Sequence, residues 1–464
     1  MQFLLILAVL AALTISESCP RQPVDGAAFR LALAAGSVAA VALFAWVGSL
    51  AIARRLLADF DRRHVLLGRF RQLRRVHAVL WLGVAGGILY GLDWAQLVRF
   101  NWHLDRALLV DDLLILTPVL LPLVLGWAAF YEVEQALQTR LAGGDRPQTR
   151  DATRRQYVVL HVRHYLGVLL VPVLVLLAVQ DAFELIAPGW LEGPAAAVVH
   201  LGPLVVLFVL FPVLLRHVWD TRPLPPGRLR QRLEGVARRS GFRARQILVW
   251  QTGGMVVNAA VTGFVPFFRY VFLTDGLLGR LSEEEIEAVF GHEVGHIRHR
   301  HLLLRVAAMF APLSLWLLVL EGLPETAAQL QDWISAAGPT LKVPMGLIAL
   351  GAMALYMLLV FGCYSRLLEF QADLFACGSL EPHPEGQAPV ATFISALEKL
   401  AAANGTDRNT RSWQHASVAR RVGFLARVAG DPIFQRRFQR QVRLLGVLIL
   451  AVVLSPLVFQ LLLG

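Results

Sequence analysis

The sequence predicts a mainly α-helical protein that crosses a membrane about nine times and carries a small β-sheet in a polar part of the chain. Three observations predict this fold class. Hydrophobic residues make up 56% of the 464 residues and charged residues only 17%, against roughly a quarter charged in soluble domains. Long charge-free windows recur along the chain, and arginine gathers in alternate connecting segments. This composition argues against a soluble enzyme and excludes a disordered chain and a disulfide-rich scaffold.

A helix needs about 17 to 25 apolar residues to cross the hydrocarbon core, and nine windows satisfy this requirement. They are residues 1–17, 31–53, 78–98, 113–131, 165–187, 194–216, 302–322, 343–364 and 443–463. The first window lacks a basic amino-terminal region and ends in Ser16-Glu17-Ser18. It is therefore either an anchor or a signal peptide cleaved at a small-x-small pattern.

Arginine is unevenly distributed among the connecting segments. Arginine-rich segments, 54–77 with eight and 132–164 with six, alternate with arginine-poor segments, 18–30 and 99–112 with two each and 188–193 with none. Basic residues in short loops collect on the cytoplasmic side. We therefore expect the polar segments 217–301 and 365–442 to lie in the cytoplasm. Because orientation accounts for most of the net charge of +11, nucleic-acid binding is not needed to explain it.

The polar segment that follows the sixth window contains the expected β-sheet. A Pro-rich hinge at 222–227 separates it from that window, and an amphipathic, arginine-rich stretch follows at 228–239. Short apolar runs then predict strands at 246–250, at 255–261 after a Gly253-Gly254 turn, and at 269–274.

A helix with a well-marked amino terminus comes next. Ser282 can cap it, and Glu285 three residues later completes a capping box. Leu281 and Ile286 have the spacing of a hydrophobic staple around this cap. The predicted helix then runs on through His299.

This helix carries two histidines four residues apart, His292 and His296. Their imidazoles project from one face and can both bind a single zinc ion, while Glu293 lies beside that face, where it can deprotonate a zinc-bound water. The alternative is a surface helix with two solvated histidines. Gly291 and Gly295 favour the metal site, because each costs about 1 kcal/mol relative to Ala, a cost explained if something approaches this face closely.

A catalytic zinc needs a third protein ligand, and the segment after the eighth window offers one. Glu369 and Asp373 are four residues apart in a helical setting and so share a face. Glu369 would supply a carboxylate ligand, and Asp373 would accept the far N–H of a ligating histidine. The alternative is that both acids, with Arg366, form the charged interfacial end of a membrane helix.

Together these motifs resemble the integral-membrane zinc metallopeptidases that include the CAAX prenyl endopeptidases and the HtpX-like heat-shock proteases. Four elements carry the resemblance, in the right order: Asn258 to Gly263, His292 to His296, Ser365 to Asp373, and His415 to Arg421. The resemblance covers about residues 220 to 430. The last element departs from the family pattern at Ala416, where the family usually has proline.

The resemblance implies roles for individual residues. The zinc ligands, for one Zn²⁺ per chain, would be His292, His296 and Glu369. Glu293 would be the catalytic base, and His415 and Arg421 would stabilise the oxyanion. Asn258 would lie on a strand along the substrate cleft. His299 and His301 are expected instead to belong to a solvated or headgroup-facing basic cluster, since a third histidine ligand would compete with Glu369.

The expected fold is therefore mainly α, with multi-pass transmembrane helices and a cytoplasmic zincin-like catalytic domain containing a small β-sheet. Its expected parts are an N-terminal transmembrane region of about six spans, 1–216; a catalytic segment with HExxH, 217–301; two transmembrane helices, 302–364; a catalytic segment with the third zinc ligand, 365–442; and a C-terminal transmembrane helix, 443–464.

The predicted function is that of a membrane-embedded zinc endopeptidase that hydrolyses membrane-associated or misfolded polypeptides. The alternatives are a CAAX-type processing peptidase for lipidated or other specific peptides, a catalytically silent polypeptide-binding relative, and a transporter or structural membrane protein in which HExxH is accidental. Basic residues that are almost all arginine are typical of a GC-rich bacterial genome, which favours quality control in a bacterial inner membrane. Its expected partners are polypeptide substrates and the lipid bilayer. The sequence does not indicate an oligomeric state.

Overall fold

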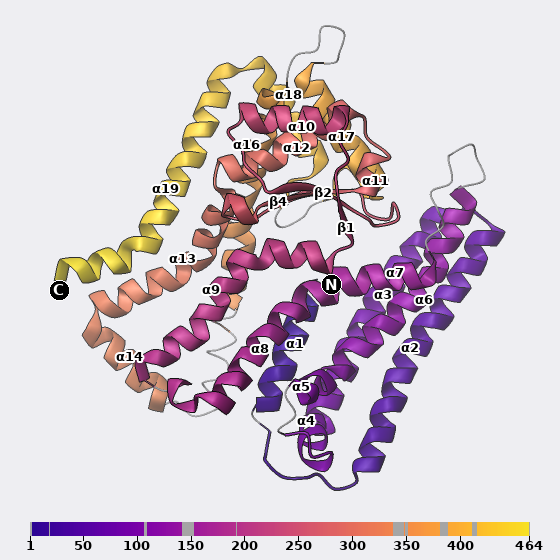
Figure 1. The fold of residues 1–464 in the computed structure, drawn as a ribbon, viewed down its shortest axis with the longest axis vertical. Helices are drawn as coiled ribbons and strands as arrows, with labels where there is room; N and C mark the ends of the chain where they lie inside the picture. Colours follow the sequence, from indigo (N-terminus) through magenta and orange to yellow (C-terminus); the bar gives the residue numbers. More distant parts are fainter. Residues whose placement is uncertain are drawn as a thin grey trace. The chain divides into compact units, whose positions relative to one another are not determined.

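The computed structural model describes residues 2–17, 19–105, 109–141, 153–191, 193–336, 348, 351–380, 388–410 and 415–463. Helices dominate these residues, and the chain also contains a small sheet (Figure 1). The chain divides into two compact units, Met1–Thr221 and Arg222–Gly464. Each unit has its own packing.

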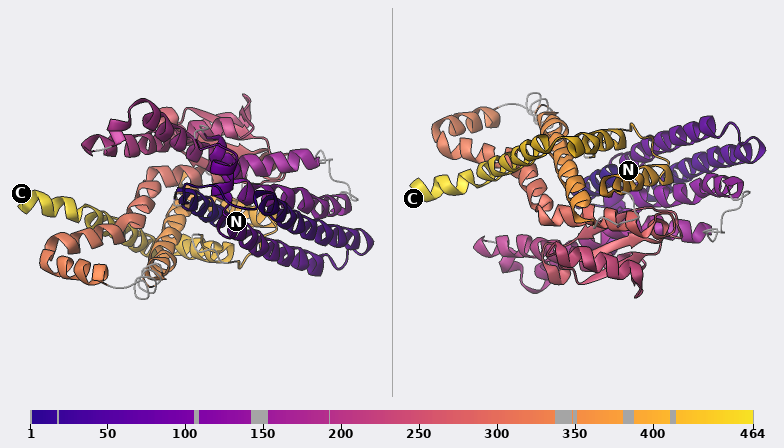
Figure 2. Two further views of the ribbon diagram at one scale, coloured as in Figure 1. Left: turned by 90° about the horizontal axis from the view of Figure 1, so that it is seen from below. Right: turned by 90° about the horizontal axis from the view of Figure 1, so that it is seen from above.

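The first unit is a set of helices. They are α1 (Gln2–Glu17), α2 (Ala27–Ala58), α3 (Arg63–Gly86), α4 (Trp94–Gln96), α5 (Val110–Ile115), α6 (Thr117–Leu141), α7 (Arg154–His161), α8 (Val168–Ile186) and α9 (Gly193–Val218), with short π or 3-10 segments at Gly87–Gly91, Leu97–Asn101, Val162–Gly167 and Pro188–Leu191. The long helices α2, α3 and α6 lie side by side (Figure 2). Trp81 of α3 is fully buried among them, and its indole N–H donates to the carbonyl of Val119 at 2.8 Å.

Six helices among the described residues are long and apolar enough to cross a membrane. They are Ala27–Ala58, Arg154–Ile186, Ala195–Val218, His301–Gly322, Gly351–Ser379 and Pro432–Leu462. A seventh crossing is possible if the pair Arg63–Gly91 and Trp94–Asn101, bent by 61°, forms one span. The multi-pass helical fold is therefore confirmed, and the described residues contain six or seven such helices, compared with the nine windows predicted.

Three predicted windows have no counterpart among the six helices: 78–98, which falls in the bent pair, 1–17 and 113–131. Window 1–17 forms α1, whose 16 residues extend about 24 Å at 1.5 Å per residue, less than the roughly 30 Å hydrocarbon core. Window 113–131 is divided between α5 and α6, and α6 continues through Glu132 and Glu134. Of window 343–364, residues 343–347 and 349–350 lie outside the described residues.

The second unit combines helices with the sheet. Its helices are α10 (Arg228–Arg239), α11 (Asp275–Leu278), α12 (Glu283–Arg298), α13 (His301–Gly322), α14 (Pro324–Ala336), α16 (Gly362–Ser379), α17 (Pro389–Ala403), α18 (Val418–Gly430) and α19 (Pro432–Leu463), with short turns at Pro266–Phe268 and Met357–Phe361. The strands are β1 (Thr221–Pro223), β2 (Gln246–Trp250), β3 (Ala259–Thr262) and β4 (Tyr270–Thr274), in the order β1-β2-β4-β3. Strand β4 pairs parallel with β2 and antiparallel with β3, so β3 forms one edge of the sheet.

The predicted strands at 246–250 and 269–274 are confirmed, but β3 begins at Ala259 rather than at residue 255. The loop before it is held by hydrogen bonds and does not form an extended strand. The carboxylate of Asp275 accepts hydrogen bonds from the backbone N–H groups of Thr252 at 3.0 Å and Gly254 at 3.1 Å. Gly253 and Gly254 both have positive φ, 66° and 76°, a conformation that glycine adopts without strain.

Helix α12 begins where the sequence predicts. Ser282 and Glu285 form the capping box, with both reciprocal hydrogen bonds present. Leu281 and Ile286 are buried in the same apolar cluster, together with Phe290 on the next turn. Because α12 is anchored in this core and also packs on α16 and α17, its histidines are held on a rigid element.

Candidate active site

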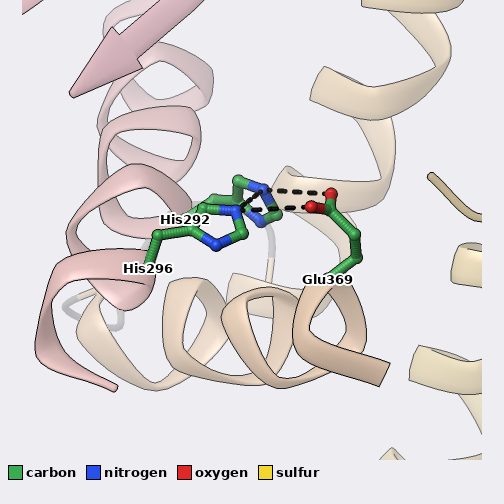
Figure 3. Close-up of side chains that lie close together, drawn as sticks. All are labelled: His292, His296 and Glu369. Carbon is green, nitrogen blue, oxygen red and sulfur yellow. Dashed lines mark hydrogen bonds and ion pairs between the residues drawn. The ribbon is translucent and has the colours of Figure 1, made fainter. Parts of the chain in front are cut away.

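Helix α12 presents His292 and His296 toward α16 (Figure 3). Their Nε2 atoms are 3.2 Å apart, as expected for side chains one turn apart on one helix face. His292 is buried and His296 is partly buried. Burial lowers the pKa of His296 well below its usual range, which favours the neutral imidazole that binds metals. The two side chains are therefore not solvated groups on a surface helix.

Glu369 of α16 completes a three-residue group. Its Oε2 lies 3.8 Å from His292 Nε2, and its Oε1 lies 3.6 Å from His296 Nε2. One donor atom from each residue lies within 4.8 Å of the other two. Two imidazole nitrogens and a carboxylate oxygen form a donor set that zinc takes in catalytic sites, where a fourth position stays open. The residues therefore fit a zinc ion.

The two glycines of α12 explain how α16 comes this close. A Cβ at Gly295 would lie 3.1 Å from Phe375 Cβ and 3.2 Å from Ala372 Cα, and a Cβ at Gly291 would meet the Ser379 hydroxyl and the backbone at Ala376. The close approach that the sequence led us to expect is therefore made by α16, the helix that carries Glu369.

Replacing Gly295 with alanine is expected to weaken the site. Overpacking costs about 1–3 kcal/mol, whereas alanine gains only about 1 kcal/mol of helix propensity, so the free energy of unfolding should fall and zinc affinity should fall with it. Thermal unfolding and zinc titration would measure both. Gly423→Ala on α18 is the control, because a Cβ there meets nothing within 4 Å. Equal stability of the two variants would contradict the packing argument.

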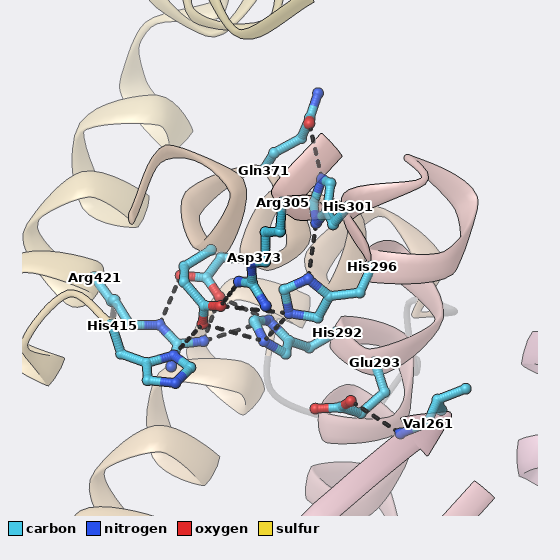
Figure 4. Close-up of polar contacts among 11 residues, drawn as sticks. Val261, His292, Glu293, His296, His301, Arg305, Gln371, Asp373, His415 and Arg421 are labelled. Atoms are coloured by element: carbon cyan, nitrogen blue, oxygen red, sulfur yellow. Dashed lines mark hydrogen bonds and ion pairs between the residues drawn. The ribbon is translucent and has the colours of Figure 1, made fainter. Parts of the chain in front are cut away.

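Glu293 lies beside the histidine pair and faces the edge strand (Figure 4). Its Oε2 accepts a hydrogen bond from the backbone N–H of Val261 on β3 at 3.2 Å. Desolvation raises the pKa of Glu293 above its usual range, and the Glu369 carboxylate adds to this effect. A carboxylate with a raised pKa, next to a metal-binding group, suits a general base.

Asp373 and Arg421 lie on the other side of His292. The Asp373 side chain is fully buried, its Oδ1 is 2.9 Å from His292 Nδ1, and its Oδ2 accepts from Arg421 Nε at 2.8 Å. A second Arg421 nitrogen also donates to Asp373. The predicted contact between Asp373 and a histidine is present. Because Arg421 is engaged with Asp373 behind His292, its geometry favours a positioning role over direct contact with an oxyanion.

His415 lies on the exposed side of the group. Its side chain is 56% exposed, and its Nδ1 is 3.1 Å from Glu369 Oε2. The following Ala416 is buried, so the residue at the position of the usual proline packs into the core. His415 thus has one ring nitrogen next to the Glu369 carboxylate, and more than half of its side chain is exposed.

Asn258 lies immediately before the edge strand. Its side chain is exposed, and its backbone carbonyl accepts a hydrogen bond from the backbone N–H of Thr274 on β4 at 3.0 Å. No contact between Asn258 and the histidine pair is present among the described residues. The Asn258 side chain is free to face a ligand that lies along β3.

The sequence analysis missed Arg305. This residue of α13 lies 64 positions before Glu369, and its Nη2 donates to Glu369 Oε1 at 2.6 Å. Because His415 contacts the other oxygen, both oxygens of Glu369 have a partner. Nothing in the sequence singles out Arg305 from the other arginines near span ends.

The prediction of a solvated cluster is wrong for His301. This residue is fully buried, and its Nδ1 lies 2.7 Å from His296 Nδ1. His299 is partly exposed and its ring stacks on that of His301, with centroids 5.6 Å apart. The positive φ of 57° at Arg300 turns the chain between α12 and α13, and this turn brings His301 back against His296.

Comparison with known proteins agrees with this geometry. Residues 223–428 match peptidase family M48. The chain is similar to this family over these residues. The match includes α12, α16 and the segment through Arg421, so all the residues discussed above lie within it. The resemblance inferred from the sequence motifs is confirmed.

Several curated proteins similar to this chain are named protease HtpX homolog. The chain is 30% identical to that of Aeropyrum pernix over 179 residues, 37% of this chain and 54% of the relative. It is 30% identical to that of Pyrobaculum calidifontis over 203 residues, 43% and 56% of the two chains. The chain thus spans about half the length of these relatives. A crystal structure of S. mikatae Ste24p is similar with a TM-score of 0.46 and 16% identity, over 88% of this chain and all of that one.

Proposed function

We propose that this protein is a membrane-embedded, zinc-dependent endopeptidase. The single observation that carries the proposal is the group formed by His292, His296 and Glu369 within 4.8 Å of one another, with Glu293 beside it. Chance occurrence of HExxH does not bring a third ligand from a separate helix to the same point. The intact base and ligand set also argue against a catalytically silent relative.

Each residue of the site would have a separate role in peptide-bond hydrolysis. Bound zinc would polarise the scissile carbonyl and lower the pKa of water toward about 7. Glu293 would accept the proton of the attacking water and return it to the leaving amine. His415, exposed next to Glu369, would donate a hydrogen bond to the developing negative charge on the substrate. Asp373 would hold His292 in the tautomer whose Nε2 is free to bind.

The edge strand β3 would bind the substrate backbone. In an antiparallel pair, successive backbone N–H groups point alternately toward and away from the partner strand. The N–H of Val261 points to Glu293, and the residue two positions earlier, Ala259, has the same orientation. An extended peptide added beside β3 would therefore pass Glu293. Such pairing recognises the backbone of the substrate and tolerates many different side chains. This property suits membrane-associated or misfolded polypeptides as substrates.

The ends of the spans in the second unit support a cytoplasmic active site. Arginines precede α13 at Arg298 and Arg300 and occupy the start of α19, whereas the segment after α13 carries Glu325 and Asp332. Basic residues favour the cytoplasmic side. The catalytic segments 217–301 and 365–442 would therefore lie on the cytoplasmic side of a bacterial cell membrane. The spans between and after these segments would hold them at the membrane surface.

Removal of metal tests the proposal. The full-length protein, reconstituted in lipid, should contain about one zinc per chain and cleave an unfolded test protein such as labelled casein. A chelator should abolish cleavage, and added zinc should restore it. His292→Ala should lose the metal, whereas His217→Ala, which removes an exposed histidine, should keep it. A wild-type protein that remains metal-free in added zinc would overturn the proposal.

A further inference from the structure

A chain of hydrogen-bonded side chains leads from His296 to the C-terminal helix α19. His296 Nδ1 is 2.7 Å from His301 Nδ1, and His301 Nε2 is 3.0 Å from Gln371 Oε1 (Figure 4). Gln371 Nε2 donates to Gln439 Oε1 at 2.6 Å. His301 and Gln371 are buried, with exposed fractions of 0% and 2%. Four residues, one each from α12, α13, α16 and α19, thus form one polar network whose two middle members are buried.

The amide of Gln371 determines the direction of this network, that is, which side chain donates and which accepts in each hydrogen bond. Its NH₂ group can only donate and its carbonyl oxygen can only accept. Because the NH₂ group donates to Gln439, the carbonyl oxygen of Gln371 faces His301. His301 must therefore carry its proton on Nε2, since a carbonyl accepts only from an N–H.

The direction continues to the metal site. A buried imidazole in its neutral form has a single N–H, and in His301 that N–H is on Nε2. His301 Nδ1 is then an acceptor, so His296 Nδ1 must be the donor in the 2.7 Å contact. This leaves His296 Nε2 without a proton, and Nε2 is the atom that faces His292 and Glu369.

We propose that Gln371 and Gln439 are positioning residues that fix the metal-binding tautomer of His296, and that α19 is coupled to the zinc site in this way. The inference rests on the proposed zinc function. The opposite direction is self-consistent but unproductive. If residue 439 donated, the Gln371 amide would turn over, His301 would donate from Nδ1, and the proton of His296 would lie on Nε2, where it blocks metal binding.

Substitutions at residue 439 can determine whether this residue accepts a hydrogen bond from Gln371 or donates one to it. Glutamate can only accept and lysine can only donate. Gln439→Glu should therefore keep the zinc affinity of the wild type, whereas Gln439→Lys should lower it by about 10- to 100-fold, the usual loss on removing a partner of a metal-bound histidine. Affinity would be measured on the full-length protein in detergent by competition with a chelator. The visible spectrum of bound Co²⁺ would report whether the ligand geometry changes.

A matched control separates the network from a simple charge effect. Gln435 lies one turn before Gln439 on α19 and is exposed, so Gln435→Lys should leave the zinc affinity unchanged. If the Gln439→Lys protein does not fold, Gln371 provides a second pair: Gln371→Met should lower affinity about tenfold, and Gln371→Glu, which still accepts from His301, should restore it.

The outcomes distinguish this inference from the proposed function. A wild-type protein that binds no zinc would overturn both. If the wild type binds zinc and Gln439→Lys binds it as tightly, or if Gln371→Met and Gln371→Glu lose affinity equally, the network is only structural and the inference fails. Retention in the two glutamate variants together with loss in Gln439→Lys and Gln371→Met would support it.

Discussion

Glu293→Gln is expected to slow peptide hydrolysis by about 10²- to 10⁴-fold, the usual contribution of a positioned general base. Zinc content should not change, because the side chain does not belong to the ligand group of His292, His296 and Glu369. Glutamine has the shape of glutamate and its carbonyl can still accept from the N–H of Val261. It cannot take a proton from water, so only the proton-transfer step is lost.

The measurement is the cleavage rate of a labelled unfolded protein by reconstituted wild type and variant, with zinc content determined on the same samples. Glu283→Gln serves as the control, because Glu283 lies on the same helix and its ion pair with Arg228, at 3.3 Å, is largely exposed. Such pairs contribute little, so this variant should cleave at the wild-type rate. Equal rates for Glu293→Gln and wild type would show that Glu293 is not the base.

The ligand helix could be predicted from sequence because its signals are local. The capping box at Ser282 and Glu285 lies within four residues, and the spacing of His292 and His296 depends only on helix geometry. The position of Glu369 required a match to a known motif, since nothing local brings α16 to α12. Gly291 and Gly295 carried part of that information, because they implied close approach of some element without identifying it.

Long-range contacts account for what the sequence analysis missed. Arg305, His301 and Gln371 act through partners 64 to 70 positions away or across a change of helix, and each type of residue is common near the end of a membrane helix. The expectation that His301 belongs to a solvated or headgroup-facing cluster rests on the argument that a third histidine ligand would compete with Glu369. The left-handed turn at Arg300, which reverses that assignment, involves a residue that rarely adopts positive φ.

The number of membrane spans also depends on long-range packing, which the sequence analysis could not predict. Windows of apolar residues identified the long helices, but the division of window 113–131 between α5 and α6 depends on packing. The alternation of arginine-rich loops along the first unit holds only if α6 also crosses the membrane. In the second unit the proposed orientation rests on the charges at the ends of α13 and α19 and does not depend on α6.

Arg421→Met is expected to lower the free energy of unfolding by about 3–5 kcal/mol, because it leaves the carboxylate of Asp373 buried without its cation. Asp373 is fully buried and accepts two hydrogen bonds from Arg421. Lysine should not restore stability, since it cannot form the two parallel hydrogen bonds of a guanidinium. Thermal unfolding in detergent would measure the loss, and Arg420→Met, which removes an exposed arginine from the same helix, is the control.

This variant also separates the two roles considered for Arg421. An arginine that only stabilises an oxyanion would lower the cleavage rate and leave stability and zinc affinity unchanged. A positioning arginine would lower all three, because Asp373 orients His292 through the 2.9 Å contact with its Nδ1. The double variant Asp373→Asn with Arg421→Met removes both buried charges, so it should be more stable than Arg421→Met alone. If it is not, the buried pair does not account for the loss, and Arg421 stabilises the protein through contacts other than Asp373.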